Sequence, residues 1–254
     1  MEKHPAQLFL SLRDKADCEI NQQVSTRRMK TRSLRSGTRP VRYSTHARQV
    51  LLGVMLLGAS LTFAADAPQR VVAIVPLGPV KQEYLERAAQ EIQARMDVEV
   101  RIEPQRELPA EAFYKPRKRW RAEKLLEALD ANPPAGAWKV MGVTEAEIST
   151  TKGDIVDWGI AGLGNIGGQS CVVSAFIYKK HSKSKNVLLR RLGDLAVHEF
   201  GHTLGFPHCE VEGCVMADAK GKAIKSADTS SGQYCAQCLE LLSPEDRALL
   251  KPQK

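Results

Sequence analysis

The chain has 254 residues, of which 43% are hydrophobic and 26% are charged, a composition that excludes disordered and fibrous proteins. A net charge of +8 ordinarily suggests nucleic acid or an anionic membrane as the partner. Residues 1–64, however, contain 11 Lys and Arg against 4 Asp and Glu, so seven of the eight net charges lie there. Because residues 65–254 are nearly neutral, we expect no nucleic-acid partner.

An export signal is predicted in this basic segment. From Met29 to Arg48 there are six Lys and Arg and no acidic residue, and an apolar run follows at residues 50–63. Small residues come next, and this order is that of a secretory signal peptide, with cleavage expected after Ala64. An uncleaved anchor and a buried core helix are the alternatives, but a spanning helix needs about 20 apolar residues. We expect an exported protein, periplasmic or secreted, with no stable membrane span after processing.

The first 28 residues form a polar extension that signal peptides rarely carry. We hypothesise that translation starts at Met29 and that residues 1–28 are not translated. The chain is therefore divided into an N-terminal extension with a signal peptide, residues 1–64, and one domain, residues 65–254, without internal repeats.

The hydrophobic pattern of the second part is that of an α/β domain. The run at 71–76 is continuously apolar, as in a strand buried on both faces, and the apolar positions at 81–96 recur at helical spacing. In chain order we predict strand 71–76, helix 81–96, strand 98–102, helix 116–129, strand 138–143, strand-like runs 155–160 and 171–178, and helix 186–204.

Two further stretches have competing interpretations. The glycine-rich stretch 162–168 is expected to be a loop beside an edge strand, because it does not lead into a helix as a phosphate-binding loop would. The basic run from Lys115 to Lys124 is interpreted as a solvated helix face or, alternatively, as an anion-binding patch for a substrate carboxylate.

Residues 198–208 have the pattern HExxHxxGxxH. His198 and His202 are four apart on the predicted helix, so their imidazoles project from one face and can share a zinc ion. Gly205 lets the chain leave the helix, and His208 can then supply a third nitrogen. Three neutral ligands leave the zinc one open position, which is typical of a catalytic site.

Glu199, beside the first histidine, is the candidate general base. Zinc activates a water molecule and polarises a carbonyl, and the carboxylate takes the proton of that water. The sequence thus predicts a zinc metallopeptidase acting on a peptide or protein substrate. A non-catalytic zinc-containing peptide-binding module and a zinc hydrolase of non-peptide amides remain alternatives.

Four cysteines follow the motif: Cys209, Cys214, Cys235 and Cys238. Two close pairs about twenty residues apart have the spacing of a structural zinc site with four thiolate ligands. Export argues for disulfides instead, since oxidising compartments favour them. We expect a second, structural zinc and keep the disulfides as the alternative.

The combined pattern, from HExxHxxGxxHC through C-x4-C-x-M to C-x-x-C, resembles the archaemetzincins, a family of metzincin-like zinc peptidases. The resemblance covers Val71 to about Leu242. It implies a metzincin-like single domain with a mixed β-sheet, an active-site helix below it, an edge strand lining the cleft and a C-terminal four-cysteine zinc subdomain. It implies one catalytic zinc on His198, His202 and His208, with Glu199 as base and Met216 beneath the metal, and one structural zinc on the four cysteines.

Some features depart from that family. Many metzincins place a tyrosine shortly after the methionine, whereas Ala217 and Asp218 stand here, so Tyr234 is our candidate for a transition-state donor. The segment after Met216 is unusually polar, with three lysines. We expect a monomer, and the pattern does not separate aminopeptidase from endopeptidase action.

Overall fold

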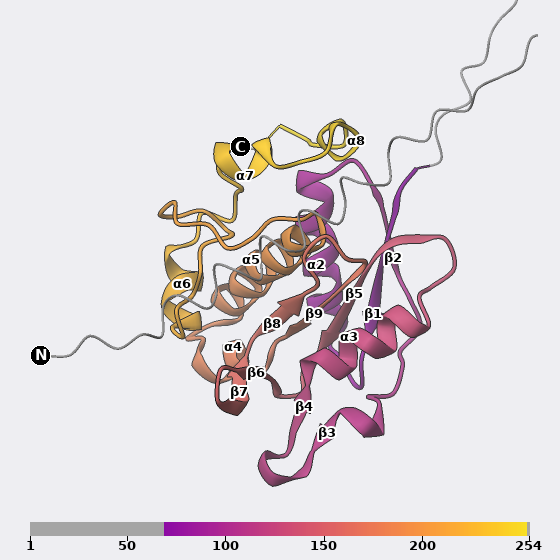
Figure 1. Cartoon of the computed structure of the whole chain (residues 1–254), viewed down its shortest axis with the longest axis vertical. Helices are drawn as coiled ribbons and strands as arrows, with labels where there is room; N and C mark the ends of the chain where they lie inside the picture. Colours follow the sequence, from indigo (N-terminus) through magenta and orange to yellow (C-terminus); the bar gives the residue numbers. More distant parts are fainter. Residues whose placement is uncertain (1–68, 253–254) are drawn as a thin grey trace, which may run out of the picture. The chain divides into compact units, whose positions relative to one another are not determined.

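The computed structural model describes residues 69–252, so the predicted signal peptide and the proposed start at Met29 lie outside the described residues. A five-stranded sheet forms the centre of the domain (Figure 1). Its strands are, in spatial order, β2 (Glu99–Ile102), β1 (Val71–Pro76), β5 (Ala137–Thr144), β9 (Ser170–Ser174) and β8 (Gly162–Gly164). The first four are parallel and β8 is antiparallel to β9, so the mixed sheet is confirmed.

Alternation along the central strands divides the apolar side chains between two cores. In β1, Val72 and Ile74 belong to one cluster, and Val75 belongs to the other. The first cluster is covered by α2 (Gln82–Arg95) and α5 (Lys185–Thr203), and the second by α3 (Ala122–Ala131) (Figure 1). The sheet is therefore buried on both faces, which explains the continuous apolar run predicted at 71–76.

A second, four-stranded sheet stands beside the first. Its strands are, in order, β3 (Phe113–Tyr114), β4 (Arg119–Arg121), β6 (Ile148–Lys152) and β7 (Ile155–Ile160). The predicted strand at 155–160 thus exists as β7, paired antiparallel with β6. The hairpin of β6 and β7 leads through Ala161 directly into β8, so the two sheets meet next to the edge strand.

The predicted helix at 116–129 begins later than expected. A 3-10 turn, η2 (Lys115–Arg117), and strand β4 precede α3, because Trp120 and Arg121 pair with Ile148 and Ser149 of β6. The basic run is therefore not a helix face. Several of its cations form ion pairs instead: Arg119 with Glu147 and Asp157, Arg121 with Glu123, and Lys124 with Glu127.

Two predictions around the glycine-rich stretch also need correction. The stretch was expected to be a loop, but its first three residues are the edge strand β8 itself. The apolar run 171–178 is not one strand, because β9 ends at Ser174 and helix α4 (Phe176–His181) begins two residues later. The hydroxyl of Ser174 accepts a hydrogen bond from the backbone N–H of Phe176, at 3.1 Å, which helps the chain change direction there.

The predicted helices 81–96 and 186–204 are confirmed as α2 and α5 to within one residue at each end. Ser184 caps α5 by accepting a hydrogen bond from the N–H of Val187. Besides α4, four short helices were not predicted: η1 (Ala110–Ala112), α6 (Ala223–Thr229), α7 (Ala236–Glu240) and α8 (Pro244–Arg247).

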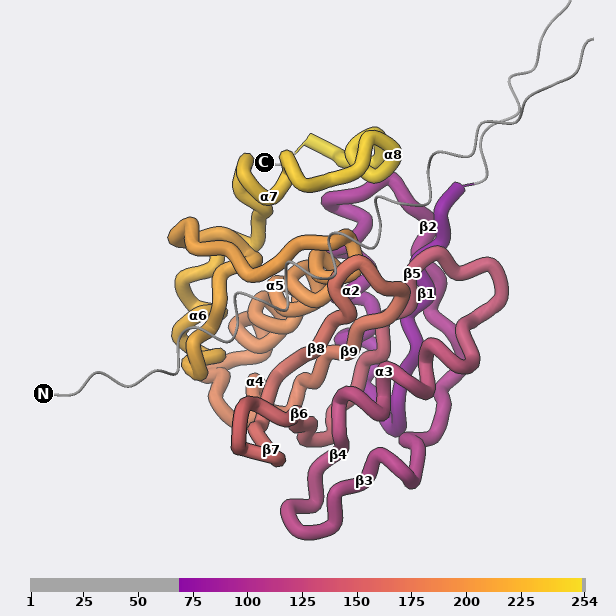
Figure 2. Tube along the Cα trace, viewed as in Figure 1, coloured from indigo at the N-terminus to yellow at the C-terminus, as the bar shows by residue number. Residues whose placement is uncertain are grey.

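The C-terminal segment returns to the start of the domain, as the tube in Figure 2 shows for α8 and α2. The N–H of Asp97 donates to the carbonyl of Leu249, and the N–H of Lys251 donates to that of Arg95. Residues after α8 therefore belong to the same domain as α2. Over residues 69–252 no helix is both long and apolar enough to cross a bilayer.

Candidate metal centres

Helix α5 brings the first two histidines of the motif together. The Nε2 atoms of His198 and His202 lie 3.2 Å apart. The Nδ1 of His198 is 2.7 Å from the carbonyl oxygen of Val215, and that of His202 is 2.7 Å from the carbonyl oxygen of Phe206. Because a carbonyl only accepts, each Nδ1 carries the proton and each Nε2 keeps its lone pair for a metal.

The third histidine arrives by a turn after α5. Gly205 has a φ of +98°, which favours glycine, and its N–H donates to the carbonyl of His202. The ring of His208 then stands with its centroid 5.3 Å from that of His198 and 4.9 Å from that of His202. The three ligand nitrogens all lie within 4.8 Å of one another. The sequence prediction that these side chains converge is confirmed.

The histidine cluster fits zinc. Nitrogens about 2.0–2.1 Å from a tetrahedral zinc stand roughly 3.3–3.4 Å apart, close to the 3.2 Å between the first two. Burial, and after it the charge of His202, lowers the pKa of His198 to about 3. Burial likewise lowers the pKa of His202. Both imidazoles are therefore neutral at pH 7, which is the form that binds metal.

Glu199 is buried, with 5% of its surface exposed, between α5 and β8. It lines the same cleft as the three histidines. Burial raises the pKa of its carboxyl to about 8, since a low-dielectric site disfavours the charged form. A cation at the adjacent histidines acts in the opposite direction and favours the carboxylate.

The close approach of α5 to the edge strand requires the glycines of β8. A Cβ added to Gly164 would lie 2.7 Å from the carbonyl oxygen of Glu199 and 2.8 Å from the Cβ of His202. An added Cβ at Gly162 would collide with the Glu199 carboxylate. The glycines thus allow the edge strand to lie directly over the general-base candidate, a role that spacing alone did not reveal.

A cleft of about 700 Å³ opens in front of the histidines. One side is formed by the β6–β7 hairpin and β8, and the other by residues 215–230, which include α6. The polar segment after Met216 is therefore a wall of the cleft. The sequence analysis identified the lysines of this segment but did not predict that the segment lies beside the cleft.

Lys139 connects two segments of the chain at the end of the site. It is the cationic residue in the otherwise apolar and neutral strand β5, and its Nζ donates to the carbonyls of Gly168, at 2.7 Å, and Thr203, at 2.6 Å. It therefore joins the loop after β8 to the last turn of α5, next to His202. Burial lowers the pKa of Lys139. A lone lysine in a buried strand was the signal that could have identified it.

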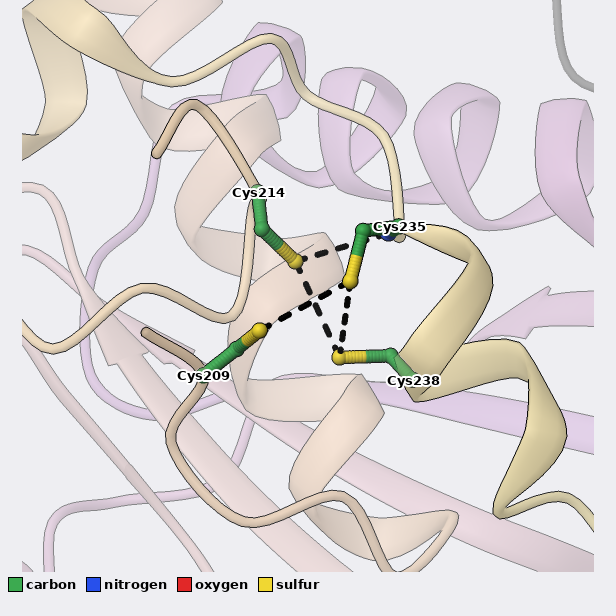
Figure 3. A group of neighbouring side chains, drawn as sticks. All are labelled: Cys209, Cys214, Cys235 and Cys238. Carbon is green, nitrogen blue, oxygen red and sulfur yellow. Dashed lines mark hydrogen bonds between the residues drawn. The ribbon is translucent and has the colours of Figure 1, made fainter. Parts of the chain in front are cut away.

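The four cysteines form the second cluster, with their sulfurs turned toward one another (Figure 3). The Sγ atoms are 3.6 Å apart for Cys209 and Cys235, and 3.7 Å apart for Cys214 and Cys238 and for Cys235 and Cys238. Thiolates about 2.3 Å from a tetrahedral zinc stand roughly 3.8 Å apart, whereas a disulfide requires about 2.05 Å. Every cysteine in the described part of the chain has a free thiol, so the cluster fits zinc.

Met216 and Tyr234 both lie beneath α5. Met216 is fully buried with its sulfur against Gly201, as expected for a methionine under the metal ligands. The Tyr234 hydroxyl donates to the carbonyl of Val197 at 2.8 Å, and its residue is 4% exposed. Tyr234 does not line the cleft. Its proposed role as a transition-state donor is therefore wrong, since its ring packs on Phe206 in the core.

The profile of peptidase family M54 matches residues 89–244, a span that contains both clusters. The chain belongs to peptidase family M54. It is accordingly a zinc metallopeptidase, a hydrolase of peptide substrates.

Relatives of this M54 member include archaemetzincins. The chain is 27% identical over 179 residues to the archaemetzincin of Haloquadratum walsbyi, covering 68% of this chain and 99% of the relative. It is 28% identical over 185 residues to that of Methanocaldococcus jannaschii, covering 70% and 94%. The family expected from the motif is confirmed.

Crystal structures of archaemetzincins share the fold. The archaemetzincin from Methanopyrus kandleri aligns with a TM-score of 0.60 at 23% identity, over 70% of this chain and 96% of that one. The Archaeoglobus fulgidus protein complexed with malonate aligns with a TM-score of 0.58 at 24% identity, over 68% and 99%. The metzincin-like domain predicted from the sequence is thereby confirmed.

Proposed function

We propose that this M54 peptidase cleaves peptide bonds at a zinc ion held by His198, His202 and His208, with Glu199 as the general base. The observation that carries the proposal is the convergence on a single cleft of three imidazoles, two of them oriented by backbone carbonyls, and one buried carboxyl. When bound, zinc supplies Lewis-acid polarisation of the scissile carbonyl and acidifies water.

The chain's own groups supply the remaining chemistry. The carbonyls of Val215 and Phe206 hold the imidazoles in one tautomer and orientation. Glu199 accepts a proton from the attacking water and returns it to the leaving amine, a task for which a pKa near neutrality is suited. β8 lies over this carboxyl and limits the access of bulk water.

The test is Glu199→Gln in the zinc-loaded protein. We expect kcat for peptide hydrolysis to fall by roughly 10²–10⁴-fold with the zinc content unchanged. The control, Glu212→Gln, changes an exposed glutamate outside the cleft and should leave kcat unaltered. A Glu199→Gln enzyme with wild-type kcat contradicts the base role. If wild type and variant are equally inert on a broad peptide library, a binding module is indicated. Release of an acid and an amine from amides that are not peptides indicates the other class of zinc hydrolase.

We further propose a second, structural zinc on Cys209, Cys214, Cys235 and Cys238. The sulfur spacing of 3.6–3.7 Å supports it. Metal analysis should find two zinc ions per chain with all four thiols reactive after chelation. One zinc together with missing free thiols would favour disulfides.

We propose that the protein is exported and acts as a monomer. The charge and apolar pattern of residues 29–64 supports export, and all seven proposed zinc ligands come from a single chain. N-terminal sequencing of the exported protein should begin at or near Ala65, and light scattering should give the mass of one chain. A peptide from residues 3–27 would contradict the start at Met29, and a dimer mass would contradict the monomer.

A further inference from the structure

The cleft continues beyond the three histidines into an apolar pocket. This pocket lies between the β6–β7 hairpin and residues 217–230, with α5 as its floor. Its apolar walls are formed by Trp158, Ile160, Ile177, Leu195, Val215 and Ile224. Apolar walls of this kind suit a bulky aliphatic or aromatic side chain.

One end of the pocket is narrowed by contact between its two walls. The indole of Trp158 lies against Gly221, where an added Cβ would stand 3.3 Å from the ring. The ammonium of Lys152 lies over the same indole, 5.2 Å from its centroid. A side chain in the pocket is therefore bounded by the hairpin on one side and the 217–230 segment on the other.

Three exposed lysines line this cleft: Lys152, Lys222 and Lys225. Within residues 69–252 no carboxylate forms an ion pair with any of them. Asp228 pairs with Arg190 and Arg191. Asp218 lines the cleft itself, and its pKa is lowered by the hydrogen bond from the N–H of Lys220 and, after it, by charges that include Lys152. Three lysines against this one carboxylate leave the rim of the apolar pocket with a net positive charge.

We propose that this pocket selects peptides that carry a bulky apolar side chain beside the hydrolysed bond and a carboxylate within one or two residues of it. The inference rests on the proposed peptidase function and names its substrate class. The carboxylate has two sources, an acidic side chain or the C-terminus of a short peptide. Both present the same anion to the lysines, and separate probes distinguish them.

The test measures binding in the zinc-loaded Glu199→Gln protein, so that the probes stay intact. Four acetylated probes are compared: a glycine–leucine–glutamate amide, its glutamine counterpart, a glycine–leucine dipeptide with a free C-terminus, and a glycine–glycine–glutamate amide. The glutamate or the free-terminus probe should bind about tenfold more tightly than the neutral glutamine probe, as expected for several exposed charge pairs. Leucine should contribute a further increase of about tenfold over glycine.

The variants assign these effects to the pocket. Combined Lys152→Glu, Lys222→Glu and Lys225→Glu should abolish the preference for carboxylate, whereas Lys118→Glu, at an exposed lysine in the turn before β4, should keep it. Ala223→Trp, which fills the pocket, should abolish the preference for leucine. If the triple variant does not fold, Lys225→Glu alone should reduce the preference, and added salt should weaken it in the parent protein.

Equal binding of all four probes, or a preference that survives the triple variant, overturns the proposal. This outcome is separate from failure of the peptidase function. A wild type without turnover but with selective binding refutes only the function, and turnover without selectivity refutes only the pocket.

Discussion

The histidine cluster and the cysteine cluster lie next to each other in the sequence, with His208 followed directly by Cys209. They differ in whether their centre is accessible to a substrate. The histidines offer three ligands at the edge of a 700 Å³ cleft, and His208 is exposed. The cysteines offer four ligands that enclose their centre, two of them buried. Three ligands and a cleft permit chemistry on a substrate, whereas four ligands satisfy zinc and permit only a structural role.

The origin of the ligands also differs. The histidines come from eleven consecutive residues, so one helix and one turn place all of them. The cysteines come from two segments, 209–214 and 235–238, that must be brought together by folding. The histidine cluster is therefore formed by a single stretch of chain, whereas the cysteine cluster connects two segments that are distant in the sequence.

The largest expected effect is that of His202→Ala. Because His202 is one of only three ligands at the open cluster, the variant should lose one zinc per chain and all measurable turnover, while the cysteine cluster keeps its metal. Inductively coupled plasma mass spectrometry and a peptide assay measure both. His181→Ala, at an exposed histidine of α4, is the matched control. Full zinc content in His202→Ala would refute the histidine centre.

Cys238→Ser should affect stability more than chemistry. The change removes a buried cysteine of the proposed structural zinc site, so the protein should lose one zinc and roughly 4 kcal/mol of its unfolding free energy. Thermal melting with and without chelator measures this. Cys171→Ala, at a buried cysteine outside the cluster, should keep both metals. An unchanged melting temperature in Cys238→Ser would mean that the cluster does not hold the two segments together.

The smallest expected effect concerns Asp194, one helical turn before His198. Burial raises the pKa of this carboxyl to about 6, against the opposing effect of Arg190, whose Nη1 is 3.1 Å from Oδ2. A raised pKa means that the folded state favours the protonated form. The contribution of Asp194 to the free energy of unfolding is therefore fully present when the pH is below 3.8, the ordinary pKa of an aspartate. This contribution is lost as the pH rises through about 6.

Asp194→Asn should remove this dependence. The melting temperature of the wild type, relative to the variant, should fall as the pH is raised across that window to neutrality. A difference that stays constant with pH would show that Asp194 titrates normally. A difference that grows with pH would show that the ion pair with Arg190 outweighs burial.

The parts of the fold that depend on local pattern were predictable from the sequence. The apolar run 71–76 and the spacing of α5 identified a buried strand and the active-site helix, because periodicity records which faces are buried. The histidines followed from their position on that helix. The orientation of His198 and His202 by the carbonyls of Val215 and Phe206 was not predictable. Every residue has a backbone carbonyl, and no side chain in the sequence indicates which carbonyl accepts the hydrogen bond.

The parts that depend on distant pairing were not predictable. Strand β4 has three residues and exists because Trp120 and Arg121 pair with β6, so local propensity favoured a helix there instead. Strand β8 is made of Gly162, Leu163 and Gly164, a composition typical of loops, and its strand conformation depends on pairing with β9. Tyr234 was proposed as a transition-state donor because of its hydroxyl group. The sequence did not show that this residue is buried in the core.

The carbonyl that orients His198 belongs to Val215, the residue that follows the zinc-ligand candidate Cys214. Two consecutive residues, Cys214 and Val215, therefore take part in the two centres. Any occupancy of the thiolates that fixes residues 214–215 also fixes His198, and by reciprocity a metal on the histidines favours the arrangement of the thiolates. Zinc at one proposed centre should consequently raise the affinity of the other, so that the single zinc kept by His202→Ala should bind more weakly than the same zinc in the wild type.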